Sequence, residues 1–321
     1  MARFARRAWL AVAAAAVGLG APSAGVDGAA RPRRSLADGD SAPLSRVVVS
    51  AASMSHAWHL GEFFKMVEKI NVHRIPVALW DIGLGLERPA ISALVSHVAT
   101  AELRTLNFSA VPSFFVVEGG SHYAGEYAWK AYIMGEMLAD FDLVLWLDAG
   151  DGVRDALALD RIFDKVATVG FWSDTSGRSV QRWVHPKLLT ELGAAALAFA
   201  EHEGAYAGMC NAALVGFSRR HALYEAFFVP WRRCSMDLAC IAPPGSDRWN
   251  HRQDQASLTV LAYLAGVGAR YCNASAVEAK RQGIDSHLFD KKFASRVGPR
   301  NRSAYVAHVQ PDPFCLHVRC P

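Results

Sequence analysis

The sequence of 321 residues lacks the short motifs of several common enzyme classes. It contains no GxSxG nucleophile elbow, no HExxH metal-binding pair, no GxGxxG after its first predicted strand and no phosphate-binding GxxxxGKS or GxxxxGKT loop. These absences argue against a lipase, a metalloprotease, a dinucleotide-dependent enzyme and a P-loop kinase. Because no Cys-x-x-Cys pair occurs either, a structural zinc site is not expected.

The body of the chain also lacks a net charge. Residues 1–46 hold seven arginines and three acidic residues; removing these from the 34 basic and 30 acidic residues of the whole chain leaves 27 of each. A balanced charge disfavours a basic groove that follows a nucleic-acid backbone, so no nucleic-acid partner is expected. The apolar fraction of 52% is ordinary for a globular protein with a substantial core.

The basic excess lies at the N-terminus, where Arg3, Arg6 and Arg7 precede an apolar run over residues 8–19. With the small residues that follow, this pattern predicts a signal peptide or signal anchor over residues 1–24. The run is shorter than the roughly 20 residues of a full span, which favours cleavage. A Golgi-type membrane anchor stays open, since thin early membranes accept short spans. Residues 25–45 are expected to form a disordered stem, and residues 46–321 one folded domain.

Cysteines are absent from the first 209 residues, and all six lie further on, at Cys210, Cys234, Cys240, Cys272, Cys315 and Cys320. Behind a secretory signal, an even number of cysteines favours disulfides over buried free thiols. Cys234–Cys240 and Cys315–Cys320 would close short loops. Three glycosylation sequons begin at Asn107, Asn273 and Asn301. Together these features predict a glycoprotein of the secretory-pathway lumen (Golgi or endoplasmic reticulum) or a secreted one.

Apolar runs alternate with helical stripes along the chain. The predicted strands cover residues 46–52, 75–80, 103–108, 114–117, 143–148, 169–172 and 212–217. The predicted helices cover residues 56–70, 89–101, 127–138, 156–166, 219–228 and 255–264, with a long structured loop over 230–252. Strands and helices in this order predict an α/β fold with a mostly parallel sheet flanked by helices.

One strand ends in two acids. The buried run LVLWL at 143–147 is followed by Asp148 and Asp151. These acids come at the carboxyl end of the strand, and open α/β sheets bind their ligands at the carboxyl ends of strands. Carboxylate oxygens suit Mg²⁺ or Mn²⁺, and such a metal suits a diphosphate. A third ligand would come from a distant residue, with His308 as the best candidate and His317 the next. The alternatives are that Asp151 only caps the following helix and that the histidines lie on the surface.

A second polar cluster precedes the last predicted helix. Asp254 and Gln255 fall on its first turn, where they could contact sugar hydroxyls, and His251 and Arg252 come just before, where they could contact phosphate. The alternative is that the acid at this position only balances the helix dipole.

Two residues from other segments are candidates for the same site. Lys130 precedes the acidic strand by one helix and could neutralise a phosphate, although a lysine with its charge at the surface is the commoner case. Asn211 comes just before the predicted strand 212–217 and could contact a substrate or form a turn. The expected donor-binding residues are therefore Lys130, Asp148, Asn211, His251 and Arg252.

Four segments carry a resemblance to a known family: WK at 129–130, LVLWLDAGD at 143–151, CNAALVGF at 210–217 and the Cys- and Pro-rich run ending in HRQDQASLTVL at 230–261. Together, over residues 46–265, they resemble a eukaryotic family of nucleotide-diphospho-sugar glycosyltransferases assigned by analogy to GT-A enzymes. The resemblance implies a GT-A-like, Rossmann-like catalytic domain, here with a disulfide-bearing C-terminal region.

The resemblance also implies residue roles. Asp148 matches the metal-binding acid of an Asp-x-Asp type of motif, but this chain has Asp-Ala-Gly-Asp, so its second acid, Asp151, comes one position later. Asp254 and Gln255 match the family's DQ pair near sugar and acceptor, and are the expected catalytic residues. The expected metal ligands are Asp148, Asp151 and His308, holding Mn²⁺ or Mg²⁺.

The leading hypothesis is therefore a metal-assisted glycosyltransferase, in the simplest case a hexosyltransferase, that moves a sugar from a nucleotide-diphosphate donor to a glycan or glycoprotein acceptor in the secretory pathway. Two alternatives stay open. One is a non-catalytic lumenal protein that binds sugars or nucleotides, and the other is a secreted metal-dependent phosphoesterase using the same acids.

Overall fold

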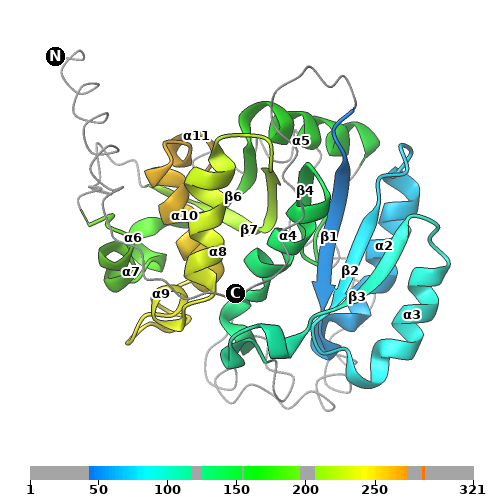
Figure 1. Cartoon of the computed structure of the whole chain (residues 1–321), viewed down its shortest axis with the longest axis horizontal. Helices are drawn as coiled ribbons and strands as arrows, with labels where there is room; N and C mark the ends of the chain where they lie inside the picture. The colour runs from blue at the N-terminus through cyan, green and yellow to red at the C-terminus, as the bar shows by residue number, and fades with distance from the viewer. Residues whose placement is uncertain (1–42, 117–123, 154, 196–206, 273–283, 286–321) are drawn as a thin grey trace, which may run out of the picture. The chain divides into compact units, whose positions relative to one another are not determined.

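The computed structural model describes residues 43–116, 124–153, 155–195, 207–272 and 284–285. A six-stranded mixed sheet lies at the centre, with the strand order β3-β2-β1-β4-β7-β6 (Figure 1). Its strands are β1 (Arg46–Ala52), β2 (Val77–Asp81), β3 (Ala101–Thr105), β4 (Leu143–Leu147), β6 (Phe171–Ser179) and β7 (Gly208–Ser218). The short strands β5 (Gly152–Val153) and β8 (Ile284–Asp285) form a separate antiparallel pair.

The predicted α/β fold is confirmed. The parallel part of the sheet is formed by the first four strands of the chain. β3, β2, β1 and β4 pair in parallel, whereas β7 is antiparallel to both β4 and β6. Helices follow β1, β2 and β3 and return the chain to the same edge, as parallel pairing requires. β6 therefore runs in the same direction as β4, with β7 between them.

Alternating side chains divide the core into two layers. From β1, Val47 and Val49 face the helices α4 (Trp129–Asp140), α8 (Val229–Ser235) and α10 (Gln253–Leu264). Val48 faces the opposite layer, which contains α2 (Leu60–Ile70), α3 (Arg88–Ser96) and α5 (Ala156–Val169). This period of two is what a strand buried on both faces shows. Figure 1 shows α8 beside α10 over one half of the sheet.

Several predicted elements need correction. The predicted strand 114–117 is wrong, because Ser113–Phe115 forms a 3-10 turn whose apolar character serves to bury Phe115. β3 ends at Thr105 and not at residue 108. The predicted loop 230–252 is also wrong in part, since it contains α8 and the short helix α9 (Leu238–Ile241). The predicted helix over 219–228 is a π-helical turn over Tyr224–Phe228 that leads into α8.

The remaining described helices are short: η1 (Met54–His59), η2 (Gly85–Glu87), η3 (Phe108–Ala110), η5 (Ala124–Tyr127), α6 (Val180–Trp183), α7 (Pro186–Glu191) and α11 (Gly268–Tyr271). In the described ranges, no helix has the length and apolar character needed to cross a membrane. The predicted signal or anchor and residues 25–42 of the predicted stem lie outside these ranges, whereas the last stem residues, 43–45, are described.

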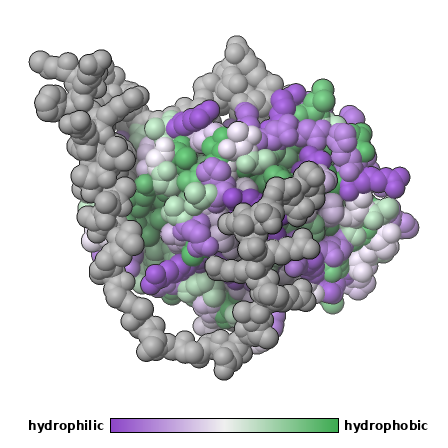
Figure 2. Space-filling view, turned by 45° about the horizontal axis from the view of Figure 1, so that its top comes forward, coloured by the Kyte–Doolittle hydropathy of each residue, from purple (hydrophilic) through white to green (hydrophobic). Residues whose placement is uncertain are grey.

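Two disulfides join described cysteines. The predicted bond Cys234–Cys240 is confirmed and connects α8 to α9. A second bond, Cys210–Cys272, connects β7 to the end of α11. The predicted pair Cys315–Cys320 lies outside the described residues. On the face drawn in Figure 2, hydrophilic residues are interspersed with hydrophobic ones over the coloured surface.

One buried acid, Asp142, ties three strands together at the edge of the sheet where β1 begins. Its carboxylate accepts hydrogen bonds from the backbone and hydroxyl of Ser45 (both 3.0 Å), from Arg219 (3.1 Å) and from Arg220 (2.7 Å). Burial alone would raise its pKa, but the hydrogen bonds from Arg220, Ser45 and Arg219 hold the pKa of Asp142 well below its usual range.

We expect Asp142→Asn to lower the free energy of unfolding by about 2 kcal/mol at pH 7, because charge-assisted hydrogen bonds are lost. A depressed folded-state pKa stabilises the native protein above about pH 4 and loses that effect as the pH falls further. The deficit of the variant should therefore shrink at pH 3. Urea denaturation at both pH values measures it, with the exposed neighbour Asp140→Asn as the control. An equal deficit at both pH values would contradict this account.

Candidate functional site

The sheet has one topological switch point. From β1 the chain builds outward through β2 and β3 and then crosses to the other side of β1 to form β4. In open α/β sheets, ligands bind in the crevice at the carboxyl ends of the two strands where this reversal occurs. β1 and β4 pair in parallel with Val49 opposite Trp146, so their carboxyl ends lie side by side. Asp148 follows β4 directly at this edge, and its backbone N–H donates to Ala213 (2.8 Å).

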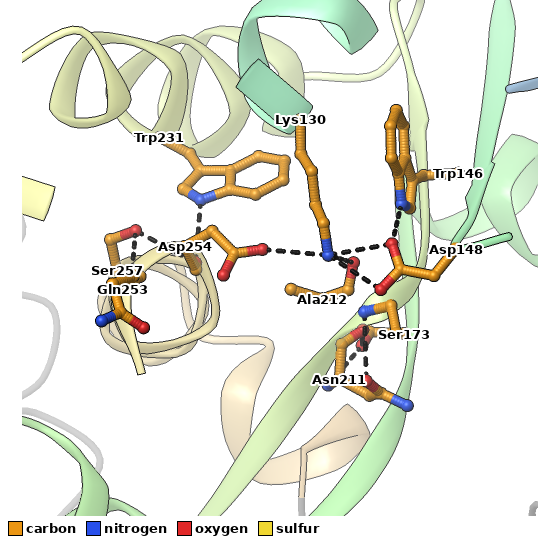
Figure 3. A network of polar contacts seen from close by, with 11 residues as sticks. Lys130, Trp146, Asp148, Ser173, Asn211, Ala212, Trp231, Gln253, Asp254 and Ser257 are labelled. Carbon is orange, nitrogen blue, oxygen red and sulfur yellow. Dashed lines mark hydrogen bonds and ion pairs between the residues drawn. The ribbon is translucent and has the colours of Figure 1, made fainter. Parts of the chain in front are cut away.

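Three predicted site residues meet there around one ammonium group (Figure 3). The Lys130 Nζ lies 2.9 Å from Oδ1 and 3.1 Å from Oδ2 of Asp148, and 3.3 Å from Oδ2 of Asp254. It also donates to the backbone carbonyl of Ala212 (3.4 Å). Helix α4, the end of β4, strand β7 and the start of α10 each contribute one of these groups. We call Lys130, Asp148 and Asp254 the charged triad.

Two tryptophans fix the carboxylate residues. The indole N–H of Trp146 donates to Oδ1 of Asp148 (2.7 Å), and that of Trp231 donates to the backbone carbonyl of Asp254 (3.2 Å). The ammonium itself lies 5.3 to 5.9 Å from the ring centroids of Tyr127, Trp129 and Trp146. Aromatic rings at this distance attract a cation while excluding water. The triad is therefore a rigid, dry arrangement on the side of Lys130.

Burial and charge have opposite effects on the triad's pKa values. Burial by itself would lower the pKa of Lys130, but the adjacent carboxylates of Asp148 and Asp254 raise it above that of an ordinary lysine. Burial raises the pKa of Asp254, and Lys130 opposes that rise. Asp148 is the accessible member, because its side chain is 34% exposed while those of Lys130 and Asp254 are 4% and 7% exposed. Asp148 therefore presents the carboxylate that solvent and a ligand can reach.

Strained backbone borders the triad. Gln253, the first residue of α10, has φ of 35°, and Glu126 and Tyr127 have φ of 49° and 56°. For residues other than glycine, such conformations cost about 1–3 kcal/mol each and tend to occur at functional sites. A hydrogen bond from Gln253 connects the two strained segments, and it opposes the rise in the pKa of Glu126 that burial causes. These three residues are not among the predicted site residues, because only the neighbouring Gly125 (φ 70°) gives a sign of the strain in the sequence.

His251 lies in the interior and not in the triad. Its side chain is fully buried, Nδ1 accepts from the backbone of His185 (3.2 Å), and Nε2 donates to the carbonyl of Ile241 (2.8 Å). Burial lowers the pKa of His251 to about 4. A neutral ring with both nitrogens bonded to the backbone holds the segment before α10 in position, and the contacts support no phosphate-binding role.

The other predicted site residues lie on the segments that supply the groups around the Lys130 ammonium, or come just before one of them. Asn211 is buried in β7 next to Ala212, and its side-chain oxygen accepts from the backbone of Ala213 (3.1 Å). Gln255 lies half-buried on the first turn of α10. The guanidinium of Arg252 packs over the ring of Trp183, 4.5 Å from its centroid. Of these, Asn211 is the one whose backbone adjoins the carbonyl bonded to Lys130.

Asp151 is buried in the turn after Asp148, where its backbone N–H donates to the Asp148 carbonyl (2.9 Å). The alternative that Asp151 caps the next helix is wrong, because Asp155 is the N-cap of α5 and accepts from Ala158 (2.7 Å). His308 and His317 lie outside the described residues.

The described residues gather no group of three or more His, Cys, Asp or Glu side chains that could hold a metal ion. Among the residues that the structure describes, Asp148 is the fitting ligand, since its carboxylate is accessible. Mg²⁺ is commonly held by one or two carboxylates, with substrate phosphates and water as the other ligands. The site therefore fits a divalent cation that arrives together with a diphosphate.

Comparisons with known proteins give structural likeness only. No family model matches the chain, and no curated protein matches it. Among solved structures, the galactosyltransferase LgtC with donor and acceptor sugar analogues is 21% identical, with coverage of 84% of this chain and 81% of that one and a TM-score of 0.40. Mouse xyloside xylosyltransferase 1 is 13% identical over 70% of this chain and 83% of that one, with a TM-score of 0.40.

Core-mannan synthase A of Aspergillus fumigatus, in an Mn/GDP form, is 10% identical over 74% of this chain and 72% of that one, with a TM-score of 0.44. All three neighbours are glycosyltransferases. At these TM-scores the likeness does not assign a function, which has to follow from the chain's own residues.

The buried neutral state of His251 predicts a loss of stability in mild acid. Because its folded pKa is lower than the unfolded value, the unfolded chain takes up the proton first, and the native state is destabilised as the pH falls from about 6.5 towards 4. We expect this to contribute about 3 kcal/mol over that interval. Chemical denaturation measures the free energy of unfolding between pH 7 and pH 4. This free energy should fall less steeply with pH in His251→Gln than in the wild type, whereas replacing the exposed His97 by Gln should leave the fall unchanged.

The shared ammonium predicts strong coupling inside the triad. Lys130→Met should destabilise the protein by about 3–5 kcal/mol, because it leaves two carboxylates without their buried counter-charge. Adding Asp254→Asn to that variant should restore part of the loss, since one of the stranded charges is removed. Denaturant titration of the two single variants and the double variant measures the coupling. Lys65→Met, on the exposed side of α2, is the control; purely additive effects of the two triad changes would refute the coupling.

Proposed function

We propose that this chain is a glycosyltransferase that moves a sugar from a nucleoside-diphosphate donor to an acceptor. The observation that carries the proposal is the charged triad: two carboxylates from β4 and α10 share one buried ammonium at the switch-point edge of an α/β sheet. The resemblance of the segments that hold these residues to nucleotide-diphospho-sugar glycosyltransferases supports the same conclusion. The donor, in this proposal, occupies the crevice between the carboxyl ends of β1 and β4.

The three residues have different roles in this proposal. Asp148 contacts the donor, because it is the accessible member of the triad. Asp254 is buried and acts through Lys130 as a positioning residue. This differs from the sequence prediction of a directly catalytic Asp254, since its side chain is 7% exposed and directed at the ammonium. Lys130 fixes the orientation of the Asp148 carboxylate, which also accepts from Trp146.

The accessible charge of Asp148 bears on how a diphosphate is bound. The Asp148 carboxylate would repel a bare diphosphate, so the donor requires a cation at Asp148. Mn²⁺ or Mg²⁺ bound there would stabilise the negative charge on the departing phosphate oxygen when the bond from the anomeric carbon breaks. Asp148 is the residue we assign to hold the ion, while ligand roles for Asp151 and His308 stay predictions.

We further propose that the reaction takes place in the lumen of the secretory pathway or outside the cell, with an acceptor on a glycan or glycoprotein. The bonds Cys210–Cys272 and Cys234–Cys240 support an oxidising compartment. The first sequon is compatible with glycosylation, because Asn107 is exposed. The N-terminal pattern of residues 1–24 supports entry into that pathway, as a cleaved signal or an anchor.

The test combines binding with turnover. Thermal melting with a panel of nucleoside diphosphates, with and without Mn²⁺, should reveal at least one nucleotide whose stabilisation depends on the metal. Hydrolysis of the matching nucleotide sugar should then be detectable, and Asp148→Asn should reduce it about 100-fold while abolishing the metal-linked shift. Asp164→Asn, an exposed acid on α5, is the matched control and should change neither quantity.

The outcomes also separate the alternative functions. Metal-linked nucleotide binding without donor hydrolysis or transfer would favour a non-catalytic binding protein. Hydrolysis of a simple phosphate ester that is lost in Asp148→Asn, without sugar transfer, would favour a phosphoesterase. No nucleotide-dependent shift with any metal, or an unchanged shift in Asp148→Asn, would reject the proposal.

A further inference from the structure

A cluster of arginines surrounds one tryptophan beyond the end of β6. The guanidinium carbons of Arg178, Arg252 and Arg182 lie 4.6, 4.5 and 5.4 Å from the ring centroid of Trp183. Arg178 belongs to β6, Trp183 ends α6, and Arg252 is the residue before α10. Stacking on one indole ring holds guanidinium groups from three segments together.

A fourth arginine connects this cluster to the charged triad. Arg248 lies over the ring of Tyr127, 5.4 Å from its centroid, and Tyr127 also faces the Lys130 ammonium (5.3 Å). Arg248 is close enough to Arg178 that, together with the larger effect of burial, it lowers the pKa of the Arg178 guanidinium. The guanidinium groups of Arg178 and Arg248 therefore lie near one another, and that of Arg178 is partly buried. We call Arg178, Arg182, Arg248 and Arg252 the arginine cluster.

Two members of the arginine cluster, Arg178 and Arg182, differ from several other arginines of the chain in their ion pairing. Arg46, Arg88, Arg219, Arg220 and Arg232 each pair with a carboxylate. In the described part of the chain, no carboxylate forms an ion pair with Arg178 or Arg182. Concentrating like charges without counter-charge is unfavourable unless an anion arrives from outside. Arg178 and Arg182 therefore have the electrostatics of a binding site for an oxyanion.

The strand order shows where this site lies relative to the donor crevice. β6 runs in the same direction as β4, so its carboxyl end is at the edge of the sheet that carries Asp148. Asp148 bonds to Ala213 of β7, whereas the end of β6 at Ser179 pairs with Gly208, five residues further along β7. At about 3.3 Å per residue, the end of β6 at Ser179 lies about 16 Å along β7 from the level of Asp148. Figure 1 shows β6 and α6 on the side of β4 away from β1.

We propose that the arginine cluster binds an anionic group, a carboxylate or a sulfate ester, on the acceptor glycan. The assignment to the acceptor rests on the proposed function, in which the donor occupies the crevice on the other side of Asp148. An offset of about 16 Å matches an acceptor that extends over several sugar units from the site of transfer. Guanidinium groups suit this ligand because their planar N–H pairs match the two oxygens of a carboxylate or sulfate.

Binding of three hexasaccharides of equal length tests the proposal. The probes are oligogalacturonate (carboxylates), a heparin-derived hexasaccharide (sulfates and carboxylates) and neutral maltohexaose, each titrated calorimetrically into the full folded chain. The wild type should bind at least one anionic probe about tenfold more tightly than maltohexaose, with an affinity that falls as salt rises. Which anionic probe binds distinguishes carboxylate from sulfate recognition.

The variant Arg178→Gln/Arg182→Gln should abolish that preference, and it leaves no described carboxylate without a partner. Arg161→Gln, an exposed arginine on α5, is the matched control and should keep the preference. The double variant should bind nucleoside diphosphates with Mn²⁺ as the wild type does. The proposal fails if the wild type does not prefer an anionic probe, if the preference survives in the double variant, or if Arg161→Gln loses it equally.

Weakened nucleotide binding in the double variant would also overturn the proposal, because the cluster would then belong to the donor. A wild type that binds no nucleotide but retains an arginine-dependent preference would reject the proposed function and the acceptor assignment, while supporting an anionic-glycan site. The two failures are thus distinguishable in the same set of titrations.

Discussion

The ion pairing of Lys130 with two carboxylates is the constraint on which the site depends. A buried ammonium is tolerated only when counter-charges and hydrogen-bond acceptors surround it, and here Asp148, Asp254 and the Ala212 carbonyl supply them. These partners come from β4, α10 and β7, which are far apart in the sequence. Folding α4 against the sheet therefore requires that the strand end and the helix start meet at one position, and this leaves Asp148 directed toward solvent.

The change from parallel to antiparallel pairing determines what surrounds that position. A parallel neighbour of β4 would have ended near the carboxyl end of β4, with loops beyond that point. The antiparallel strand β7 instead begins at Gly208, well beyond Asp148, and pairs there with the far end of β6. The extended pair supplies Asn211, Ala212 and Arg178 to the region in front of the sheet edge. The Cys210–Cys272 bond joins this extension to the end of α11, next to α10.

Much of this arrangement could be predicted from the sequence, but not the contacts that define it. The acid after an apolar strand marks Asp148, and the polar residues before an apolar helix mark Asp254, because both patterns are local. The same reasoning selected His251, whose ring is used in the interior, since a histidine beside a helix start gives no local sign of burial. Likewise, the hydrogen bond between Gln253 and Glu126 and the antiparallel placement of β7 both depend on tertiary packing. None of these has a signal in nearby residues.

The charged triad and the arginine cluster, both at this edge of the sheet, present charges of opposite sign. This difference determines how the proposed donor and acceptor would be oriented. The triad presents the Asp148 carboxylate, so it is suited to a cation and to hydroxyl groups, and it repels a bare anion. The arginine cluster presents guanidinium groups, two of which have no described carboxylate partner, so it is suited to an oxyanion. An acceptor whose anionic group is held at Arg178 would direct its neutral end toward Asp148, because the reverse orientation would bring like charges together. Charge alone therefore defines a direction along the edge, from the arginine cluster towards the crevice between β1 and β4.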